Sequence, residues 1–196
     1  VKWIAERSEA FTADSHGRDH VSTLRLALDS GGKMLGLEVD TVANMGAYLS
    51  NFGPFVPTAA GVTMLVGRYT IPTAYVQGRG VVTETAPVDA YRGAGRPEAN
   101  YVMERLMDHI AEHVGIDRVE VRRRNLIRAD QIPFTMVCGG TVDGGEMPEL
   151  MEAALSRADM AGFAARRAES ERKGRLRGFG FGMYLEQCGG GTDGGV

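Results

Sequence analysis

The apolar residues of this chain change their spacing once, and this change constrains the fold more than any other feature of the sequence. Over residues 21–42, apolar and polar residues alternate on both sides of the turn-forming sequence Asp29-Ser30-Gly31-Gly32. Alternation of this kind predicts a β-hairpin with one buried face. The remainder of residues 1–50 is also expected to form strands, and the β-branched residues within 74–84 predict one more.

Helical spacing begins at Pro97. From there to Gly115 the apolar residues recur three or four positions apart, which predicts an amphipathic helix. Asp117 and Glu120 have the spacing of a capping box, so a second helix is expected to follow and to end near Leu126. Further helices are expected after Pro148 and over two other segments, residues 58–66 and 160–172.

A closing strand is predicted at the end of the chain, because large apolar residues at positions 179, 181, 183 and 185 alternate with small or polar ones. Glycines on the opposite side of this strand would allow another backbone or a ligand to approach closely. Strands followed by helices and a last strand indicate the α+β class. We therefore expect a mixed β-sheet with a β-hairpin in the N-terminal half and helices packed on it in the C-terminal half.

The composition excludes several kinds of protein. A chain of 196 residues can bury a sizeable core, and we expect residues 1–196 to form a single domain. The net charge of −3 argues against a nucleic-acid binder. Cys138 and Cys188 lie far apart and support neither an Fe–S cluster nor a cysteine zinc site. No apolar run is long enough for a membrane span and no signal peptide is present, so a cytoplasmic location is expected.

The two ends of the chain suggest an internal piece of a larger protein. The sequence starts at Val1 in a strand-like stretch without an initiator methionine, and it stops at Val196 within a glycine-rich turn. We therefore expect this chain to be a fragment of a longer polypeptide.

The first candidate site is the loop Ala90-Tyr91-Arg92-Gly93-Ala94-Gly95-Arg96-Pro97-Glu98, which joins a predicted strand to a predicted helix. N–H groups at a helix start carry partial positive charge and suit an anionic ligand. Gly93 and Gly95 would let a ligand approach the main chain, and Arg92 and Arg96 would add charge. The alternative is an ordinary turn with solvated arginines. A Walker A loop is excluded because no Gly-Lys-Ser/Thr follows.

The second candidate is His109-Ile110-Ala111-Glu112-His113, which fits the pattern H-x-x-E-H on a predicted helix. Two histidines four residues apart share a helix face and could bind zinc, with Glu112 polarising a water. This would make the chain a zinc-dependent hydrolase. The alternative, which we favour from the residues alone, is a solvated helix flank, because the pattern is short and both histidines lie beside the apolar stripe.

A run of arginines forms the third candidate: Arg118, Arg122, Arg123, Arg124 and Arg128. The run could bind phosphate or nucleic acid, or it could mark a non-catalytic subunit-interaction module. In a net acidic chain we favour a charged helix surface that faces solvent or a partner. His16 and His20 have no convincing third metal ligand, and a helix-capping role suffices for Glu146 and Glu149.

Four segments, in their order and spacing, carry a resemblance to one family. They are Val1-Lys2-Trp3 through Arg7-Ser8-Glu9, then Asn44-Met45-Gly46-Ala47-Tyr48, then the loop Ala90 to Glu98, and last Val121-Arg122-Arg123-Arg124-Asn125-Leu126. Together they resemble the molybdenum-binding large subunit of the xanthine dehydrogenase, aldehyde oxidase and carbon monoxide dehydrogenase family. The resemblance extends over essentially the whole chain, and it makes the helix that carries His109 an ordinary structural helix.

This resemblance implies a molybdenum cofactor-binding domain within a molybdenum hydroxylase of the aldehyde oxidoreductase or carbon monoxide dehydrogenase type. Such an enzyme oxidises an aldehyde, an N-heterocycle or a similar small carbon substrate with water as the oxygen source. The implied cofactor is molybdopterin with Mo, usually in the cytosine dinucleotide form in bacteria, and the implied partners are an Fe–S subunit and an FAD subunit. By matching position, Arg92, Gly93, Ala94 and Gly95 would contact the cofactor, with Arg92 as the active-site loop residue.

The sequence departs from the family pattern in ways that narrow the expectation. In carbon monoxide dehydrogenases the corresponding loop resembles A-Y-R-C-S-F-R, with a copper-binding cysteine at the position of Gly93 in this chain. In purine hydroxylases the loop resembles one with a bulky Phe at the position of Ala94. The family's catalytic glutamate is expected beyond this chain, and Glu146 falls too early to inherit that role. The glycine segment that grips the cofactor would precede Val1. The isolated chain is therefore expected to be inactive and without cofactor.

Overall fold

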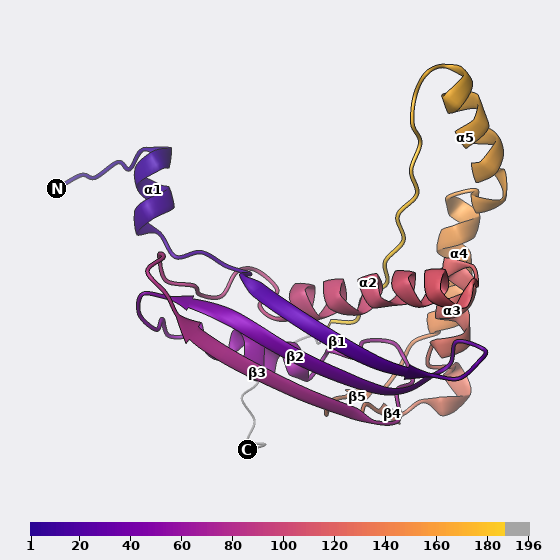
Figure 1. The fold of residues 1–196 in the computed structure, drawn as a ribbon, viewed down its shortest axis with the longest axis horizontal. Coiled ribbons are helices and arrows are strands. Elements are labelled where there is room, and N and C mark those ends of the chain that lie inside the picture. The colour runs from indigo at the N-terminus through magenta and orange to yellow at the C-terminus, as the bar shows by residue number, and fades with distance from the viewer. Residues whose placement is uncertain (187–196) are drawn as a thin grey trace.

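A computed structural model describes residues 1–186 and shows a mixed three-stranded sheet with helices on one face (Figure 1). The strands are β1 (His20–Leu28), β2 (Met34–Gly46) and β3 (Ala74–Val82), in the order β1-β2-β3. β1 and β2 form the predicted antiparallel hairpin, whereas β3 pairs with β2 in parallel. The parallel pairing requires a long crossover, and this contains the π-helix Val56–Ala60 followed by a further turn.

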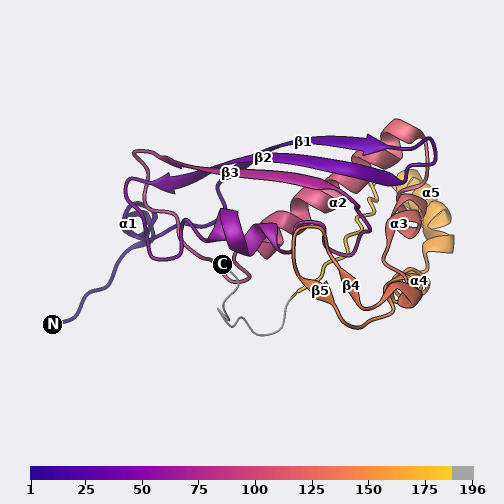
Figure 2. The same cartoon turned by 90° about the horizontal axis from the view of Figure 1, so that it is seen from below.

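Helix α2 (Arg96–Val114) lies across the inner face of the sheet, as Figure 2 shows from below. It begins and ends at glycines in positive-φ conformations, Gly95 with φ 85° and Gly115 with φ 71°. Glycine adopts such angles without the steric penalty of a Cβ, and the second is the usual way to end a helix. The hydrophobic core, to which α2 and the sheet contribute, is rich in methionine, and its buried methionines are Met34, Met64, Met103, Met107, Met136, Met147, Met151 and Met183.

The remaining elements follow α2, and the last helix among them projects away from the sheet (Figure 1). They are α3 (Arg118–Asn125), the 3-10 turn Ala129–Gln131, the small antiparallel pair β4 (Phe134–Thr135) and β5 (Thr141–Val142), α4 (Met147–Arg157), the 3-10 turn Met160–Gly162 and α5 (Phe163–Arg172). The α+β prediction and the positions of these helices are confirmed. No helix in the described part of the chain is long and apolar enough to cross a membrane.

The predicted capping box at α3 is only half correct. The Asp117 carboxylate accepts the N–H of Val119 at 2.8 Å and of Glu120 at 3.2 Å, as an N-cap should. The Glu120 carboxylate instead accepts hydrogen bonds from Arg123 and Arg124 on its own helix. The nearby guanidinium groups are charged donors, and they replace the backbone partner that the capping box would supply.

The expectation of strands at the very start of the chain was wrong. Residues 7–13 form helix α1 (Arg7–Ala13), which buries none of its residues and stands apart from the sheet in Figure 1. The stretch Val1 to Glu6 has no regular structure. The sequence of α1 shows no alternation of apolar and polar residues, so a strand formed by these residues would have no apolar face to bury.

The closing strand was also wrong, although its alternation was real. Residues 178–186 are extended but pair with no strand in the described part of the chain. Met183 is buried, and Phe179, Phe181 and Leu185 are half-buried, while the residues between them are exposed. The periodicity therefore reports which side chains face the core, and it does not require a hydrogen-bonded ladder.

Candidate functional site

The loop between β3 and α2 folds as two successive turns. The Ala94 N–H donates to the Tyr91 carbonyl at 2.7 Å, and the Arg96 N–H donates to the Gly93 carbonyl at 3.2 Å. Gly93 has φ 92°, and a Cβ added to it would lie 2.8 Å from Cγ of Pro97. Both the backbone angle and the space around it therefore require glycine at this position.

Gly95 serves internal packing. A Cβ on Gly95 would lie 2.6 Å from the Gly61 nitrogen and 2.7 Å from the Val56 carbonyl oxygen. The missing side chain lets the start of α2 press against the π-helix, and Gly95 itself is buried. We expected both loop glycines to let a ligand approach the main chain. Gly93 is exposed and could do so, whereas Gly95 is buried.

The two loop arginines have different surroundings. Arg92 is exposed and has no ion pair within residues 1–186. Arg96 is half-buried, donates to the Ala94 carbonyl at 3.2 Å, and lies 3.6 Å from the Glu186 carboxylate through its Nε. The charge of Arg96 is therefore balanced inside the chain, whereas Arg92 presents its charge to whatever lies outside the loop.

Arg18 belongs to this site although nothing in the sequence marked it. Its guanidinium donates to the carbonyl of Arg92, lies 4.7 Å from the centroid of the Tyr91 ring, and sits 3.5 Å from the Glu98 carboxylate. Arg18 has φ 63°, an uncommon angle for a residue with a side chain. The contacts join segments far apart in the chain, so only the tertiary structure could reveal them.

A groove of about 800 Å³ starts at the N-terminus of α2 and runs between this helix and the inner face of the sheet. Most of its wall is apolar, but Arg18, His20 and Glu98 lie together at the loop end. Burial lowers the pKa of His20, and the charges of Glu98 and Asp19 oppose this shift. The Oε2 atom of Glu98 is buried without a hydrogen-bond partner among residues 1–186.

The H-x-x-E-H candidate lies on an exposed flank of α2, where His109 also borders the groove. His109 and Glu112 have exposed side chains 3.7 Å apart, and Glu112 also faces Arg118 at 3.7 Å. His113 is exposed near the end of the helix. No group of three metal-ligating side chains is found in the part of the chain that the structure describes. The arrangement fits the solvated flank that we favoured.

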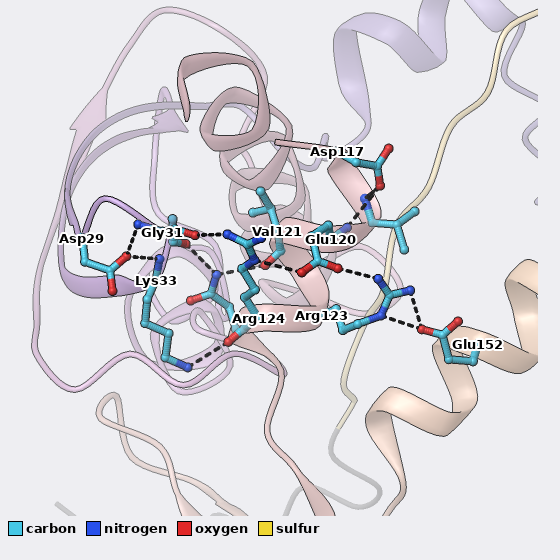
Figure 3. Close-up of polar contacts among 12 residues, drawn as sticks. Asp29, Gly31, Lys33, Asp117, Glu120, Val121, Arg123, Arg124 and Glu152 are labelled. Atoms are coloured by element: carbon cyan, nitrogen blue, oxygen red, sulfur yellow. Dashed lines mark hydrogen bonds and ion pairs between the residues drawn. The ribbon is translucent and has the colours of Figure 1, made fainter. Parts of the chain in front are cut away.

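The expectation for the arginine run was wrong in one respect. Arg123 and Arg124 are exposed in part and bind Glu120, with Arg123 also bound to Glu152 and Arg124 to the Gly31 carbonyl (Figure 3). Arg122, in contrast, is completely buried and pairs with Glu104 at 2.9 Å. The side of α3 that packs on α2 carries Arg122, and its neighbours in sequence point elsewhere.

The other titratable residues weighed from the sequence take structural places. His16 contacts the Phe11 carbonyl through Nε2 at 3.0 Å. Glu146 occupies the N-cap position of α4 but forms no side-chain capping bond, so that expectation was wrong, while Glu149 lies in the first turn. Burial raises the pKa of the Cys138 thiol, which disfavours its thiolate form. Cys188 lies outside the described residues.

Comparison with known proteins decides the family. The family model of the molybdopterin cofactor-binding domain matches residues 1–126, which include the sheet, the loop and α2. The chain belongs to the molybdopterin cofactor-binding domain family. The resemblance drawn from the four sequence segments is therefore confirmed.

Relatives of this molybdopterin cofactor-binding domain are much longer than the chain itself. The chain is 32% identical over 195 residues to the 6-hydroxypseudooxynicotine dehydrogenase complex subunit gamma of Paenarthrobacter nicotinovorans, covering 96% of the chain and 24% of the relative. It is 34% identical over 197 residues to the carbon monoxide dehydrogenase large chain of Hydrogenophaga pseudoflava, covering 97% and 24%. The chain thus spans about a quarter of these relatives.

The fold of this molybdopterin cofactor-binding domain is also similar to a solved structure. Quinoline 2-oxidoreductase from Pseudomonas putida 86 superposes with a TM-score of 0.80 at 29% identity. The similarity covers 88% of the chain and 22% of that protein. The α+β architecture is therefore that of the molybdenum cofactor-binding domains of this family.

The donor groups of the loop suit an anionic cofactor such as molybdopterin, whose phosphate and dithiolene groups are negatively charged. Gly93 exposes its main chain, and the Arg92 guanidinium beside it carries an uncompensated positive charge within residues 1–186. Neither Arg92 nor Gly93 donates its own N–H to the backbone of the described chain. Backbone N–H groups together with a guanidinium are a common donor set for oxyanions.

Proposed function

We propose that this chain forms part of the molybdenum-binding subunit of a hydroxylase or dehydrogenase, and that its loop from residue 90 to residue 96 is a wall of the cofactor site. The observation that carries the proposal is the exposed turn at Arg92 and Gly93, placed between β3 and α2 of a molybdopterin cofactor-binding domain. Arg92, Gly93 and Ala94 would contact the cofactor in this proposal, whereas Gly95, assigned to the same set from the sequence, would shape the loop through its packing on the π-helix. We assign no metal ligand to the described residues.

Each loop residue would have its own task. The Arg92 guanidinium would pair with an anionic group of the cofactor, and the Gly93 N–H would donate to it. Arg18 would hold the loop in shape, because it binds the Arg92 carbonyl and covers the Tyr91 ring. Gly95 would fix the distance between the loop and the π-helix by close packing. When bound, the molybdenum cofactor supplies the two-electron oxidation chemistry.

The substrate class in this proposal is an aldehyde, an N-heterocycle or a similar small carbon compound, oxidised with water as the oxygen source. Among the similar proteins are ones named for 6-hydroxypseudooxynicotine, nicotine, quinoline and carbon monoxide. Gly93 has no thiol, so this position offers no copper ligand. Ala94 is small, which leaves room beside the cofactor instead of the aromatic wall that a bulkier residue would give.

The whole protein would need parts that this chain does not provide. Glu146 is exposed at the start of α4, and we do not assign it the role of catalytic base. We propose that the catalytic glutamate lies elsewhere in a longer polypeptide, with Fe–S and FAD subunits as partners, a cytosine dinucleotide form of the cofactor and a cytoplasmic location. The isolated chain would then be inactive and free of cofactor.

The direct test compares variants in the complete subunit that contains this chain. Arg92→Ala should lower molybdenum content and the fluorescence of the oxidised pterin without changing the thermal unfolding of the protein, since Arg92 is exposed. Arg25→Ala is the matched control, because Arg25 is an exposed arginine on β1 far from the loop in sequence. Equal cofactor content in both variants and the unchanged subunit would contradict the proposed role of the loop.

A second measurement addresses the chain by itself. The purified 196-residue chain is expected to contain no stoichiometric molybdenum and to oxidise no aldehyde. Molybdenum bound in a one-to-one ratio would refute this part of the proposal, and would at the same time support the assignment of the loop if Arg92→Ala removed it.

A further inference from the structure

Residues 179–186 form an extended segment, here called the strap, that returns from α5 to lie against α2 (Figure 1). It has no strand partner among the described residues, so backbone pairing does not hold it in place. Buried Met183 and the half-buried side chains of Phe181 and Leu185 join the main core. Apolar contacts of this kind are not directional, and they leave open what fixes the position of the strap along the helix.

Arg122 supplies directional contacts. Its side chain is fully buried, and its Nη2 donates to the Glu104 carbonyl and to Asp108, each at 3.1 Å, and at the longer distance of 3.4 Å to the Phe181 carbonyl. Its Nε donates to the Glu104 carboxylate at 2.9 Å, and its guanidinium lies 5.4 Å from the centroid of the Phe181 ring. One rigid, planar group therefore connects α3, α2 and the strap, which a flexible ammonium could not do at once.

The other end of the strap reaches the candidate loop. The Glu186 carboxylate lies 3.6 Å from Nε of Arg96, and Arg96 in turn donates to the Ala94 carbonyl at 3.2 Å. The lengths agree with this path. The helix rises about 12 Å from Arg96 to Glu104, and the five residues from Phe181 to Glu186 can extend about 16 Å. The strap is thus long enough to span the distance along α2 from Glu104, which pairs with Arg122, to Arg96.

We propose that Arg122 is a positioning residue for the loop: it fixes the strap on α2, and the strap sets Glu186 against Arg96, which holds the Ala94 carbonyl. Arg122 touches no cofactor-facing group in this scheme and acts only through the strap. The inference deepens the proposed function, on which its meaning for cofactor binding rests. Its structural content concerns residues of this chain alone and can be measured without a cofactor.

Hydrogen–deuterium exchange of the full chain tests the proposal. Arg122→Lys keeps the charge but cannot donate to Glu104, Asp108 and the Phe181 carbonyl together. Amide exchange is expected to become about tenfold faster in the strap, which loses its contact with Arg122, and within residues 92–97 at Ala94 and Arg96, whose N–H groups are hydrogen-bonded inside the loop. Exchange in β1 should stay unchanged, and this separates loss of positioning from general unfolding.

Two further variants keep the test decisive. Arg123→Lys is the matched control, since Arg123 neighbours Arg122 but binds Glu120 and Glu152 and should leave the loop unaffected. Glu186→Gln should speed exchange in residues 92–97 but not at Phe181, and it keeps the question open to measurement if Arg122→Lys does not fold.

Unchanged exchange of residues 92–97 in both Arg122→Lys and Glu186→Gln would overturn the proposal. Failure of the proposed function would look different, because cofactor content would then be insensitive to Arg92 whatever the loop exchange showed.

Discussion

The Nε–H of Arg122 donates to Oε2 of Glu104 across 2.9 Å, and the two side chains are 0% and 9% exposed. Tyr69 completes the arrangement, because its hydroxyl donates to the other Glu104 oxygen at 2.5 Å. Burial, together with the Glu104 carboxylate, raises the pKa of Tyr69 far above its ordinary value, so its hydroxyl stays protonated. A buried charge pair of this kind is sensitive to the loss of either partner.

Removing Arg122 should therefore be far more harmful than removing its neighbour. Arg122→Ala leaves Glu104 charged and buried, and we expect a loss of about 3–5 kcal/mol in the free energy of unfolding. Arg123→Ala removes two exposed ion pairs, with Glu120 and Glu152, and should cost about 1 kcal/mol in total. Urea unfolding followed by circular dichroism measures both. Similar losses in the two variants would mean that burial of Arg122 does not determine its contribution to the free energy of unfolding.

The two glycines that bound α2 make a matched pair for a second prediction. Both glycines have positive φ, but the space around them differs. A Cβ added to Gly95 would collide with the backbone of Gly61, whereas a Cβ added to Gly115 would have no other atom within 4 Å. Gly115→Ala should cost about 1–2 kcal/mol for the backbone angle alone. Gly95→Ala should cost about 3 kcal/mol because overpacking adds to that strain. Guanidinium unfolding midpoints give the comparison, and equal midpoints would show that the loop can move aside.

Asn125 offers a third prediction, since it ties the hairpin turn to α3. Its buried amide donates to the carbonyls of Gly32 and Val121 and accepts the Met34 N–H at 2.9 Å. Asn125→Ala leaves these groups without partners and should cost about 2–5 kcal/mol. Asn51 is exposed in the crossover, so Asn51→Ala should change the melting temperature little. A stable Asn125→Ala protein would imply that water replaces the amide.

The stability of the chain should depend on pH through His20. Burial lowers the pKa of His20 below 6.5, opposed by Glu98 and Asp19. The folded state therefore favours neutral His20, and this contribution is present above pH 6.5 and is lost as the pH falls through the lower, folded-state pKa. Unfolding free energies from about pH 7.5 to about pH 5 should fall more steeply in the natural chain than in His20→Gln.

His113→Gln, which changes an exposed histidine on α2, serves as the control for this pH series. Its unfolding free energy is expected to follow that of the natural chain. Parallel curves for His20→Gln and the natural chain would exclude a contribution from His20.

Local periodicity predicted much of the fold. The hairpin of β1 and β2 and the full length of α2 follow from their apolar spacing, and many core-facing residues could be named from it. The alternation failed at the start of β2, where Leu35 is exposed and Met34 is buried. The strap shows the limit of this reasoning. Alternation at Phe181 and Met183 correctly gives the buried face, but whether an extended segment has a strand partner is decided by distant parts of the chain.

The candidate site was harder to predict because its contacts join distant segments. The loop itself was recognisable from Gly93 and Arg92 at the start of a helix, and the resemblance gave its family. Arg18 and Glu186, which contact the loop from either end of the chain, carry no local signal. Arg122 was obscured by its neighbours, since three consecutive arginines are alike in sequence and differ only in which one faces α2.

The methionine-rich core has a consequence for the oxidation of this protein. Thioethers are oxidised to sulfoxides by peroxide, and a polar sulfoxide disrupts an apolar interior. Met103 and Met107 lie on α2 with exposures of 2% and 0%, so oxidant reaches them only when the helix lifts from the sheet. Sulfoxide formed at these positions would record each such opening, and the core would lose its close fit with every event. Sulfoxide at Met103 and Met107, measured by mass spectrometry, would therefore serve as a chemical trace of transient unfolding.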